Sequence, residues 1–150
     1  MSNIDLKKIN SLRRPIVFTN GVFDILHIGH VKNLVAAKKL GKSLVVGINS
    51  DASVKKLAKG PDRPFNTSEA RKGVIRALKP VDYTFVFTED NPLISLEIIQ
   101  PEIYVKGGDY SVKDLPEAKL VSKWGGKCVI LDFLENYSTT NLVNKIRNHE

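Results

Sequence analysis

The chain has 150 residues, of which 42% are hydrophobic and 26% are charged, as in one ordinary globular domain. This composition excludes a collagen-like or wholly disordered chain, and the single cysteine excludes an intrachain disulfide. No apolar run approaches the roughly 18 residues of a membrane span, and residues 1–14 lack the apolar segment of a secretory signal. We therefore expect a cytoplasmic protein with a single domain over 1–150, in which 1–14 form an N-terminal helical extension.

Short β-branched runs alternate with helical patterns along the chain, which is the rhythm of βαβ units. The expected strands are 16–20, 44–48, 83–87, 103–105 and 128–133. The expected helices are 28–40, one capped by 49–51, one after Asn66, 92–99, 115–124 and 139–147. Together they predict an α/β fold: a Rossmann-like, doubly wound, mostly parallel five-stranded sheet with helices on both faces.

The connection after the second strand-helix unit contains a long loop and a helix start. Residues 59–64 are rich in Pro and Gly, and we expect them to fold over a ligand as a lid. Asn66 and Glu69 have the spacing of an N-cap and an N3 residue. Val74, Ile75 and Leu78 then follow as the expected apolar face of that helix.

The charge balance favours an anionic partner, because 23 Lys and Arg face 16 Asp and Glu, a net charge of +7. Nucleic acid, a membrane surface and a small polyphosphate all match this charge. The basic residues occur in short, scattered groups, and no basic tract is interleaved with aromatic residues. The pattern favours one anion-binding pocket over a nucleic-acid or membrane partner.

The first expected strand runs directly into a motif that ends in His27-Ile-Gly-His30. The two histidines bracket the start of the next helix, where unpaired N–H groups and a partial positive charge suit phosphate. Gly21 permits a sharp turn, and Gly29 leaves space for a phosphate to approach the backbone. Surface histidines or a metal pair are the alternatives, but no third ligand has an obvious metal-binding spacing with them.

Residues 20–30, Asn-Gly-Val-Phe-Asp-Ile-Leu-His-Ile-Gly-His, resemble the signature of the HxGH nucleotidyltransferase superfamily, the cytidylyltransferase-like proteins. Within it, the chain is most similar to the adenylyltransferase domains that make ADP-heptose. The segments that support this branch are 49–54, 59–60, 63–64, 69–71, 105–110 and 138–140.

The resemblance implies a set of site residues. His27 and His30 would grip the triphosphate and stabilise charge at the α-phosphorus, and Lys59 would close over the pyrophosphate leaving group. Asp24 and Arg63 would contact the substrate. The alternative for Asp24 is a carboxylate that caps a turn, and the alternative for Arg63 is an exposed basic loop. The implied nucleotide-binding residues are Thr19, Asn20, Gly21, Phe23, Gly29, Arg71, Lys106, Gly107, Asp109, Ser138, Thr139 and Thr140. For Ser138 a plain N-cap is the alternative, and for Gly107 and Asp109 a simple turn.

The resemblance also implies a reaction. The phosphate of D-glycero-β-D-manno-heptose 1-phosphate would attack the α-phosphorus of ATP in line and release pyrophosphate, with Mg²⁺ as the cofactor brought by ATP. No protein metal ligand is indicated, and nothing in the chain proposes a covalent nucleophile. The product would feed bacterial lipopolysaccharide. A homodimer and a separate upstream sugar kinase are the implied partners.

Three alternatives stay open. A cytidylyltransferase acting on glycerol 3-phosphate or another sugar or polyol phosphate would use the same histidines, although that branch usually has an arginine just before Ser-Thr-Thr, and 133–137 contain none. The family often has glycine two residues before that run, where this chain has Asn136-Tyr137. A binding module without turnover is the second alternative. A class I aminoacyl-tRNA synthetase fragment is the third, disfavoured by the chain length and by the lack of a Lys-Met-Ser-Lys-Ser run.

Overall fold

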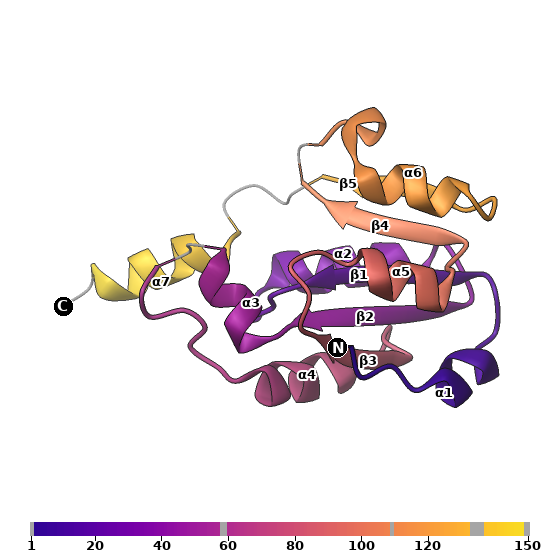
Figure 1. Cartoon of the computed structure of the whole chain (residues 1–150). Helices are drawn as coiled ribbons and strands as arrows, with labels where there is room; N and C mark the ends of the chain where they lie inside the picture. The colour runs from indigo at the N-terminus through magenta and orange to yellow at the C-terminus, as the bar shows by residue number, and fades with distance from the viewer. Residues whose placement is uncertain (1, 58–59, 109, 133–136, 149–150) are drawn as a thin grey trace.

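A five-stranded sheet, in which each strand runs parallel to its neighbours, forms the centre of the structure (Figure 1). The computed structural model describes residues 2–57, 60–108, 110–132 and 137–148. The strands are β1 (Ile16–Gly21), β2 (Ser43–Asn49), β3 (Tyr83–Phe87), β4 (Ile103–Gly107) and β5 (Lys127–Leu131). Their order across the sheet is β3-β2-β1-β4-β5. The predicted doubly wound, Rossmann-like fold is confirmed, and the described strand pairs are all parallel.

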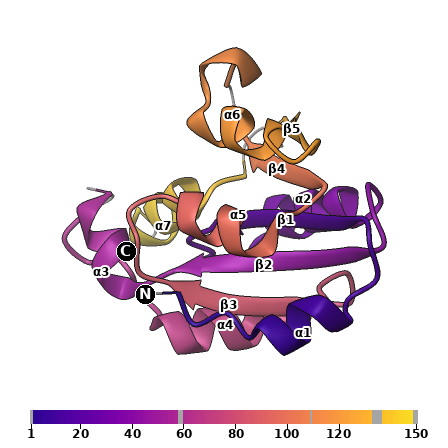
Figure 2. The ribbon, with the colours of Figure 1, turned by 45° about the vertical axis from the view of Figure 1, so that its right-hand side comes forward.

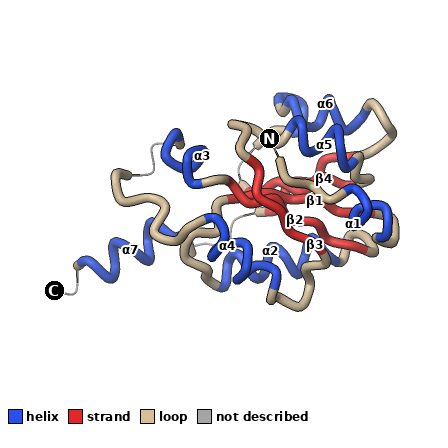
Figure 3. The backbone as a smooth tube through the Cα atoms, turned by 60° about the horizontal axis from the view of Figure 1, so that its bottom comes forward, coloured by secondary structure: helices blue, strands red, loops and turns tan. Residues whose placement is uncertain are grey.

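Helices cover both faces of this sheet. They are α1 (Leu6–Ser11), α2 (Ile28–Lys38), α3 (Asp51–Lys56), α4 (Ser68–Arg76), α5 (Leu93–Ile99), α6 (Pro116–Ser122) and α7 (Thr139–Arg147), with a 3-10 turn, η1, at Val112–Asp114. Helices α1, α5 and α6 pack on one face, and α2 and α4 pack on the other (Figure 2). Helices α3 and α7 lie beyond the carboxyl ends of the strands (Figure 3). No helix among the described residues is long and apolar enough to span a membrane.

Strand side chains alternate between two cores because successive residues point to opposite faces of a sheet. Phe18 and Tyr104 pack beneath α5 and α6, whereas Val17 and Val105 pack beneath α2 and α4. Burial on both sides explains why these strands are continuous apolar runs in the sequence. Ile9 of α1 is also buried in the Phe18 core, so this N-terminal helix is part of the cover of the sheet.

The strand order reverses at β1, which pairs with β2 on one side and with β4 on the other. Thr19, for example, is in register with Val46 of β2 and with Val105 of β4. The connections on the two sides of this point lead the chain in opposite directions, which leaves a crevice at the carboxyl ends of β1 and β4. Open α/β sheets bind their ligands at such a reversal.

Helix α4 differs from the expectation at its start and on its buried face. Its N-cap is Thr67, whose Oγ1 accepts the N–H of Ala70 at 3.3 Å, and not Asn66, which hydrogen-bonds to Asp24. Val74 is 50% exposed. The reason is that the buried side of the helix carries Ile75, which packs in the core of the sheet, and Arg71 one turn before it.

Candidate active site

A cavity of about 800 Å³ lies in the crevice at the strand-order reversal. The ends of β1 and β4, the connection from β1 to α2, and the start of α7 form most of its wall. The sequence-predicted residues that line it are Thr19, Asn20, Gly21, Phe23, Asp24, His27, Gly29, His30, Arg63, Lys106, Gly107, Ser138, Thr139 and Thr140. Two further predicted residues, Lys59 and Asp109, lie outside the described residues.

The chain leaves β1 in a tight turn that places the histidines. Phe23 has a left-handed φ of 50°, and its ring folds back against the strand end. A Cβ on Gly21 would come within 2.9 Å of that ring, so glycine lets the ring lie against the strand end. The Phe23 ring also contacts His30, with centroids 5.4 Å apart. The turn therefore fixes the histidine ring from the strand side.

His27 and His30 cap helix α2 reciprocally. The Nδ1 of His27 accepts the N–H of Gly29 at 3.1 Å, and the Nδ1 of His30 accepts the N–H of His27 at 3.2 Å. Because both Nδ1 atoms act as acceptors, both neutral rings carry their proton on Nε2. The rings lie face to face with centroids 3.8 Å apart. The backbone thus selects the same tautomer for both histidines, with the proton on Nε2.

Partial burial also affects the charge of His27. Desolvation lowers the pKa of His27 below its ordinary value of 6.5. A neutral ring at pH 7 keeps Nδ1 available as the acceptor that the cap requires. Protonation would turn Nδ1 into a donor facing the N–H of Gly29, so the neutral state and the cap support one another.

Gly29 lies in close contact with His27 on one side and Tyr137 on the other. A Cβ at this position would lie 2.8 Å from Cε1 of His27 and 3.3 Å from Cβ of Tyr137, just before α7. Ser138 caps α7 by accepting the N–H of Asn141 at 3.0 Å, so its predicted capping alternative is present in the structure. The hydroxyl of Thr139 donates to the carbonyl of Ile25 at 3.3 Å.

The first turns of α2 and α7 consequently line the same cavity. Each helix start has backbone N–H groups without partners inside the helix, and each carries a partial positive charge. Two such ends, with two imidazole donors between them, form a strong site for a polyphosphate.

Asp24 is held by protein groups and not left open to a ligand. Its carboxylate accepts Nε of Arg63 at 3.1 Å and the N–H groups of Phe65 and Asn66 at 2.8 and 2.9 Å. The turn-capping alternative therefore describes Asp24 better than a direct substrate contact. The alternative of an exposed basic loop does not describe Arg63, which is 7% exposed and lies against the cavity, where its ion pair with Asp24 holds it.

Arg71 is placed away from the cavity, contrary to the expectation of a phosphate contact. It is 1% exposed and is absent from the described residues that line the cavity. Its guanidinium donates to the carbonyls of Val22, Asn49 and Asn66 at 2.8 to 3.0 Å, and to Oδ1 of Asp51 at 2.7 Å. These four bonds use four of the five N–H donors of the guanidinium. Arg71 ties together three loops at the carboxyl edge.

The opposite face of the sheet contributes a second, polar part of the cavity wall. Nζ of Lys106 lies 3.2 Å from Oε1 of Glu117 and 4.5 Å from the ring centroid of Tyr110. Oδ1 of Asn20 accepts the hydroxyl of Tyr104 at 2.7 Å. The sequence did not indicate Glu117 or Tyr104 as site residues. A glutamate directly after a proline is common in the first turn of a helix, so the sequence around Glu117 indicates a helix start and not a binding site.

The described residues contain no group of three or more His, Cys, Asp or Glu side chains that could hold a metal ion.

Comparison with known proteins assigns the chain to a family. The cytidylyltransferase-like family model matches residues 18–145. The chain is 50% identical over 136 residues to the D-beta-D-heptose 1-phosphate adenylyltransferase of Bordetella bronchiseptica, covering 91% of this chain and 84% of that protein. It is 53% identical over 132 residues to the Bifunctional protein HldE of Hahella chejuensis, covering 88% of this chain but only 28% of that longer protein.

Solved structures show the same architecture. The lipopolysaccharide core biosynthesis protein from Thermoplasma volcanium has a TM-score of 0.65 at 31% identity, over 82% of this chain and 98% of its own. Pantothenate synthetase from Thermus thermophilus, with a TM-score of 0.53 at 15% identity over 85% of this chain and 59% of its own, shares the fold alone. The predicted resemblance and the predicted nucleotidyltransferase class are confirmed. This chain belongs to the cytidylyltransferase-like family.

Proposed function

We propose that the protein transfers the adenylyl group of ATP to D-glycero-β-D-manno-heptose 1-phosphate, giving ADP-heptose and pyrophosphate. The observation that carries the proposal is 50% identity, over 84% of its length, to a relative named for heptose 1-phosphate adenylyl transfer. The cavity supports it, because two helix starts and two histidines converge where a triphosphate would bind.

In the proposed reaction, an oxygen of the sugar phosphate attacks the α-phosphorus of MgATP in line. The new P–O bond forms as the bond to the pyrophosphate oxygen breaks. Negative charge on the transferring group is stabilised by the Nε2–H donors of His27 and His30, whose directions the capping bonds set before substrate arrives. Preorganised donors of this kind need no rearrangement as the charge develops, and phosphoryl-type transfers depend mainly on such positioning.

The acceptor itself serves as the nucleophile. Cys128, the single cysteine, lies in β5 and is absent from the described residues that line the cavity. Burial raises the pKa of its thiol, which favours the unreactive protonated form. These observations support a single displacement without an enzyme-bound intermediate.

We further propose a cytoplasmic enzyme that acts as a homodimer in the biosynthesis of lipopolysaccharide. The solved structure from Thermoplasma volcanium, titled a lipopolysaccharide core biosynthesis protein, supports the pathway. The acceptor is already phosphorylated at its anomeric carbon, so a sugar-phosphorylating reaction must supply it. A separate kinase is the proposed partner for that step.

A pyrophosphate-release assay tests the proposal directly. Purified protein with MgATP and heptose 1-phosphate is expected to release one pyrophosphate for each ADP-heptose identified by mass spectrometry. Omission of the acceptor is expected to abolish release. If CTP with glycerol 3-phosphate supports faster turnover, the cytidylyltransferase alternative replaces the proposal. If no pair in a matrix of nucleotides and sugar phosphates turns over, the chain is a binding module.

A further inference from the structure

The cavity extends to the face of the sheet opposite the histidines. Asn20 and Lys106 follow Thr19 and Val105 by one residue, so their side chains leave their strands on the face that carries Tyr104. Helix α6 lies along this face beside β4 and β5 (Figures 1 and 2). It contributes Glu117 to the cavity wall. We call the part formed by Asn20, Lys106 and Glu117 the α6 lobe.

The carboxylate of Glu117 is only partly satisfied. Its side chain is 6% exposed, and Oε1 pairs with Nζ of Lys106 at 3.2 Å. Oε2 is buried and has no hydrogen-bond partner among the described residues. Folded proteins seldom leave a buried carboxylate oxygen without a donor, because desolvation of the charge is costly. The last torsion of a glutamate side chain is soft, so a small rotation can turn either oxygen toward the cavity.

The missing partner must be a hydrogen-bond donor. A phosphate oxygen is excluded beside Glu117, because it offers no proton at neutral pH and two anions repel at this distance. A neutral hydroxyl group can donate to the carboxylate and also accept a second hydrogen bond. Asn20 can supply that second bond, because its Oδ1 accepts the hydroxyl of Tyr104 and its Nδ2 has no hydrogen-bond partner among the described residues. Burial raises the pKa of Tyr104, which keeps this phenol protonated as the donor.

The two sides of the cavity therefore suit different chemistry. The histidine side has the helix starts for phosphates, together with Leu131 and Tyr137, whose apolar surfaces suit a purine ring. The α6 lobe combines one carboxylate, one amide and one ammonium, a set that matches the hydroxyl groups of a sugar. The acceptor would then bridge the two sides, with its phosphate toward the histidines and its ring over the α6 lobe.

We propose that the α6 lobe binds the hydroxyl groups of the acceptor sugar and that Glu117 determines acceptor specificity by accepting a hydrogen bond from one of them. This inference rests on the proposed function, in which the acceptor is a sugar phosphate. It identifies hydroxyl groups, in preference to a second phosphate, as the chemistry that the α6 lobe binds.

Glu117→Gln tests the inference from the protein side, because the amide has nearly the same shape but no charge. Loss of a hydrogen bond to a charged group is expected to raise the KM for the sugar phosphate about 10- to 100-fold, with the KM for ATP unchanged. Asp114→Asn is the matched control. Asp114 is an exposed carboxylate on the same connection, so removing its charge is expected to leave both KM values unchanged.

A series of acceptors that each lack one hydroxyl group tests the inference from the ligand side. With the wild-type protein, the kcat/KM for one deoxy analogue is expected to be about 10- to 100-fold below that for the full sugar phosphate. With Glu117→Gln, the ratio of these two kcat/KM values is expected to be near unity. A rise in the KM for ATP alone would assign Glu117 to the base and overturn the inference. Unchanged KM values, or equal use of every deoxy analogue, would overturn it as well. If the variant fails to fold, the wild-type series decides.

The two proposals fail in different ways. If wild-type protein does not turn over ATP with heptose 1-phosphate, the proposed function fails. The Glu117 inference is then judged with whichever hydroxylated phosphate the wild type does use in a pyrophosphate-release screen. If the wild type is active with heptose 1-phosphate but Glu117→Gln leaves the sugar KM unchanged, the specificity role alone is wrong.

Discussion

Arg63 and Asp24 form a buried ion pair, with Nε of Arg63 3.1 Å from Oδ2 of Asp24 and side chains that are 7% and 0% exposed. Asp24 also accepts the N–H groups of Phe65 and Asn66, and its own carbonyl accepts Nδ2 of Asn66 at 2.8 Å. The pair therefore joins the connection before α4 to the turn that carries His27. Asp24, which lies within the 20–30 motif, therefore stabilises the cavity wall.

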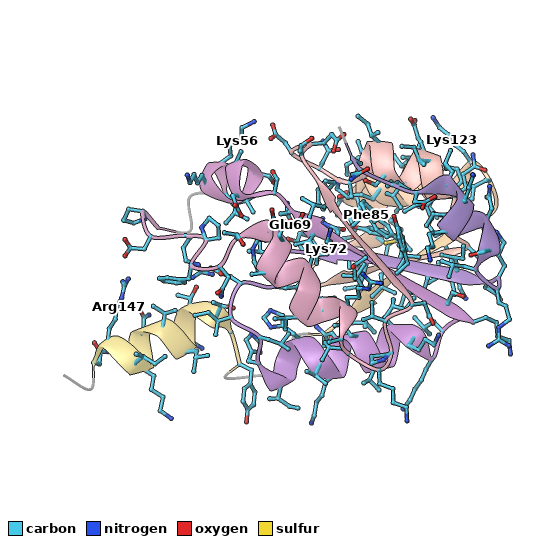
Figure 4. The ribbon with its side chains drawn as sticks, turned by 90° about the horizontal axis from the view of Figure 1, so that it is seen from below. Lys56, Glu69, Lys72, Phe85, Lys123 and Arg147 are labelled. Atoms are coloured by element: carbon cyan, nitrogen blue, oxygen red, sulfur yellow. The ribbon has the colours of Figure 1, made fainter. Side chains whose placement is uncertain are left out.

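Removing this carboxylate is expected to destabilise the fold strongly. Asp24→Ala leaves Arg63 buried without its partner, which typically costs about 3–5 kcal/mol. Urea unfolding measures this loss. The matched control is Asp62→Ala, because Asp62 forms a 2.7 Å ion pair with Arg147, at the exposed end of α7 (Figure 4). An exposed pair contributes about 0–1 kcal/mol, so equal losses in the two variants would contradict the anchoring role.

Arg71 is expected to stabilise the three loops and not to bind nucleotide. Arg71→Met removes the donor from the buried carbonyl of Asn49, from the half-buried carbonyls of Val22 and Asn66, and from Asp51. We expect a loss of about 3 kcal/mol in the free energy of unfolding. Arg76→Met, at an exposed position on the same helix, is expected to change stability by less than about 0.5 kcal/mol. A folded Arg71→Met protein with wild-type stability but weakened ATP binding would instead support the phosphate contact.

His27 is expected to titrate below the ordinary histidine pKa of 6.5. Because the folded state favours the neutral ring, its contribution to stability is present above the unfolded pKa of about 6.5 and is lost as the pH falls through the folded pKa. Activity is expected to fall over the same acid range, because protonation of Nδ1 breaks its hydrogen bond with the N–H of Gly29. NMR titration is tractable, since the chain has 3 histidines. A His27 pKa at or above 6.5 would contradict this account.

His30→Ala is expected to reduce kcat more than nucleotide affinity. The variant removes a donor directed at charge that develops in the transition state, and one such donor is typically worth roughly 10²–10³ in rate. Lys32→Ala, an exposed substitution on the same helix, serves as the control. Circular dichroism checks folding. A folded His30→Ala protein with near wild-type turnover would show that His30 has a structural role.

The sequence predicts the sheet and the histidine turn because both depend on short-range patterns. Apolar runs define the strands, and His27 and His30 are separated by one helical turn. The partners of Arg71 are less predictable, because the carbonyls of Asn49 and Val22 are 22 and 49 residues away in sequence. An arginine near a phosphate motif suggests anion binding, but only the packed structure shows that backbone oxygens occupy its donors.

The start of α4 illustrates the same limit. Asn66 and Thr67 are both good capping residues, and the spacing to Glu69 favours Asn66. Asp24, which is remote in sequence, engages Asn66 and leaves the cap to Thr67. The tautomers of the histidines are likewise set by backbone N–H groups whose directions exist only after the turn has formed.

A competition experiment tests the proposed adenylyl transfer most directly. Wild-type protein is given heptose 1-phosphate with equal concentrations of ATP and CTP, and the nucleotide sugars formed early in the reaction are separated by mass. Their ratio equals the ratio of kcat/KM for the two nucleotides, whatever the amount of active enzyme. ADP-heptose is expected to be the predominant product. A predominance of CDP-heptose would contradict it.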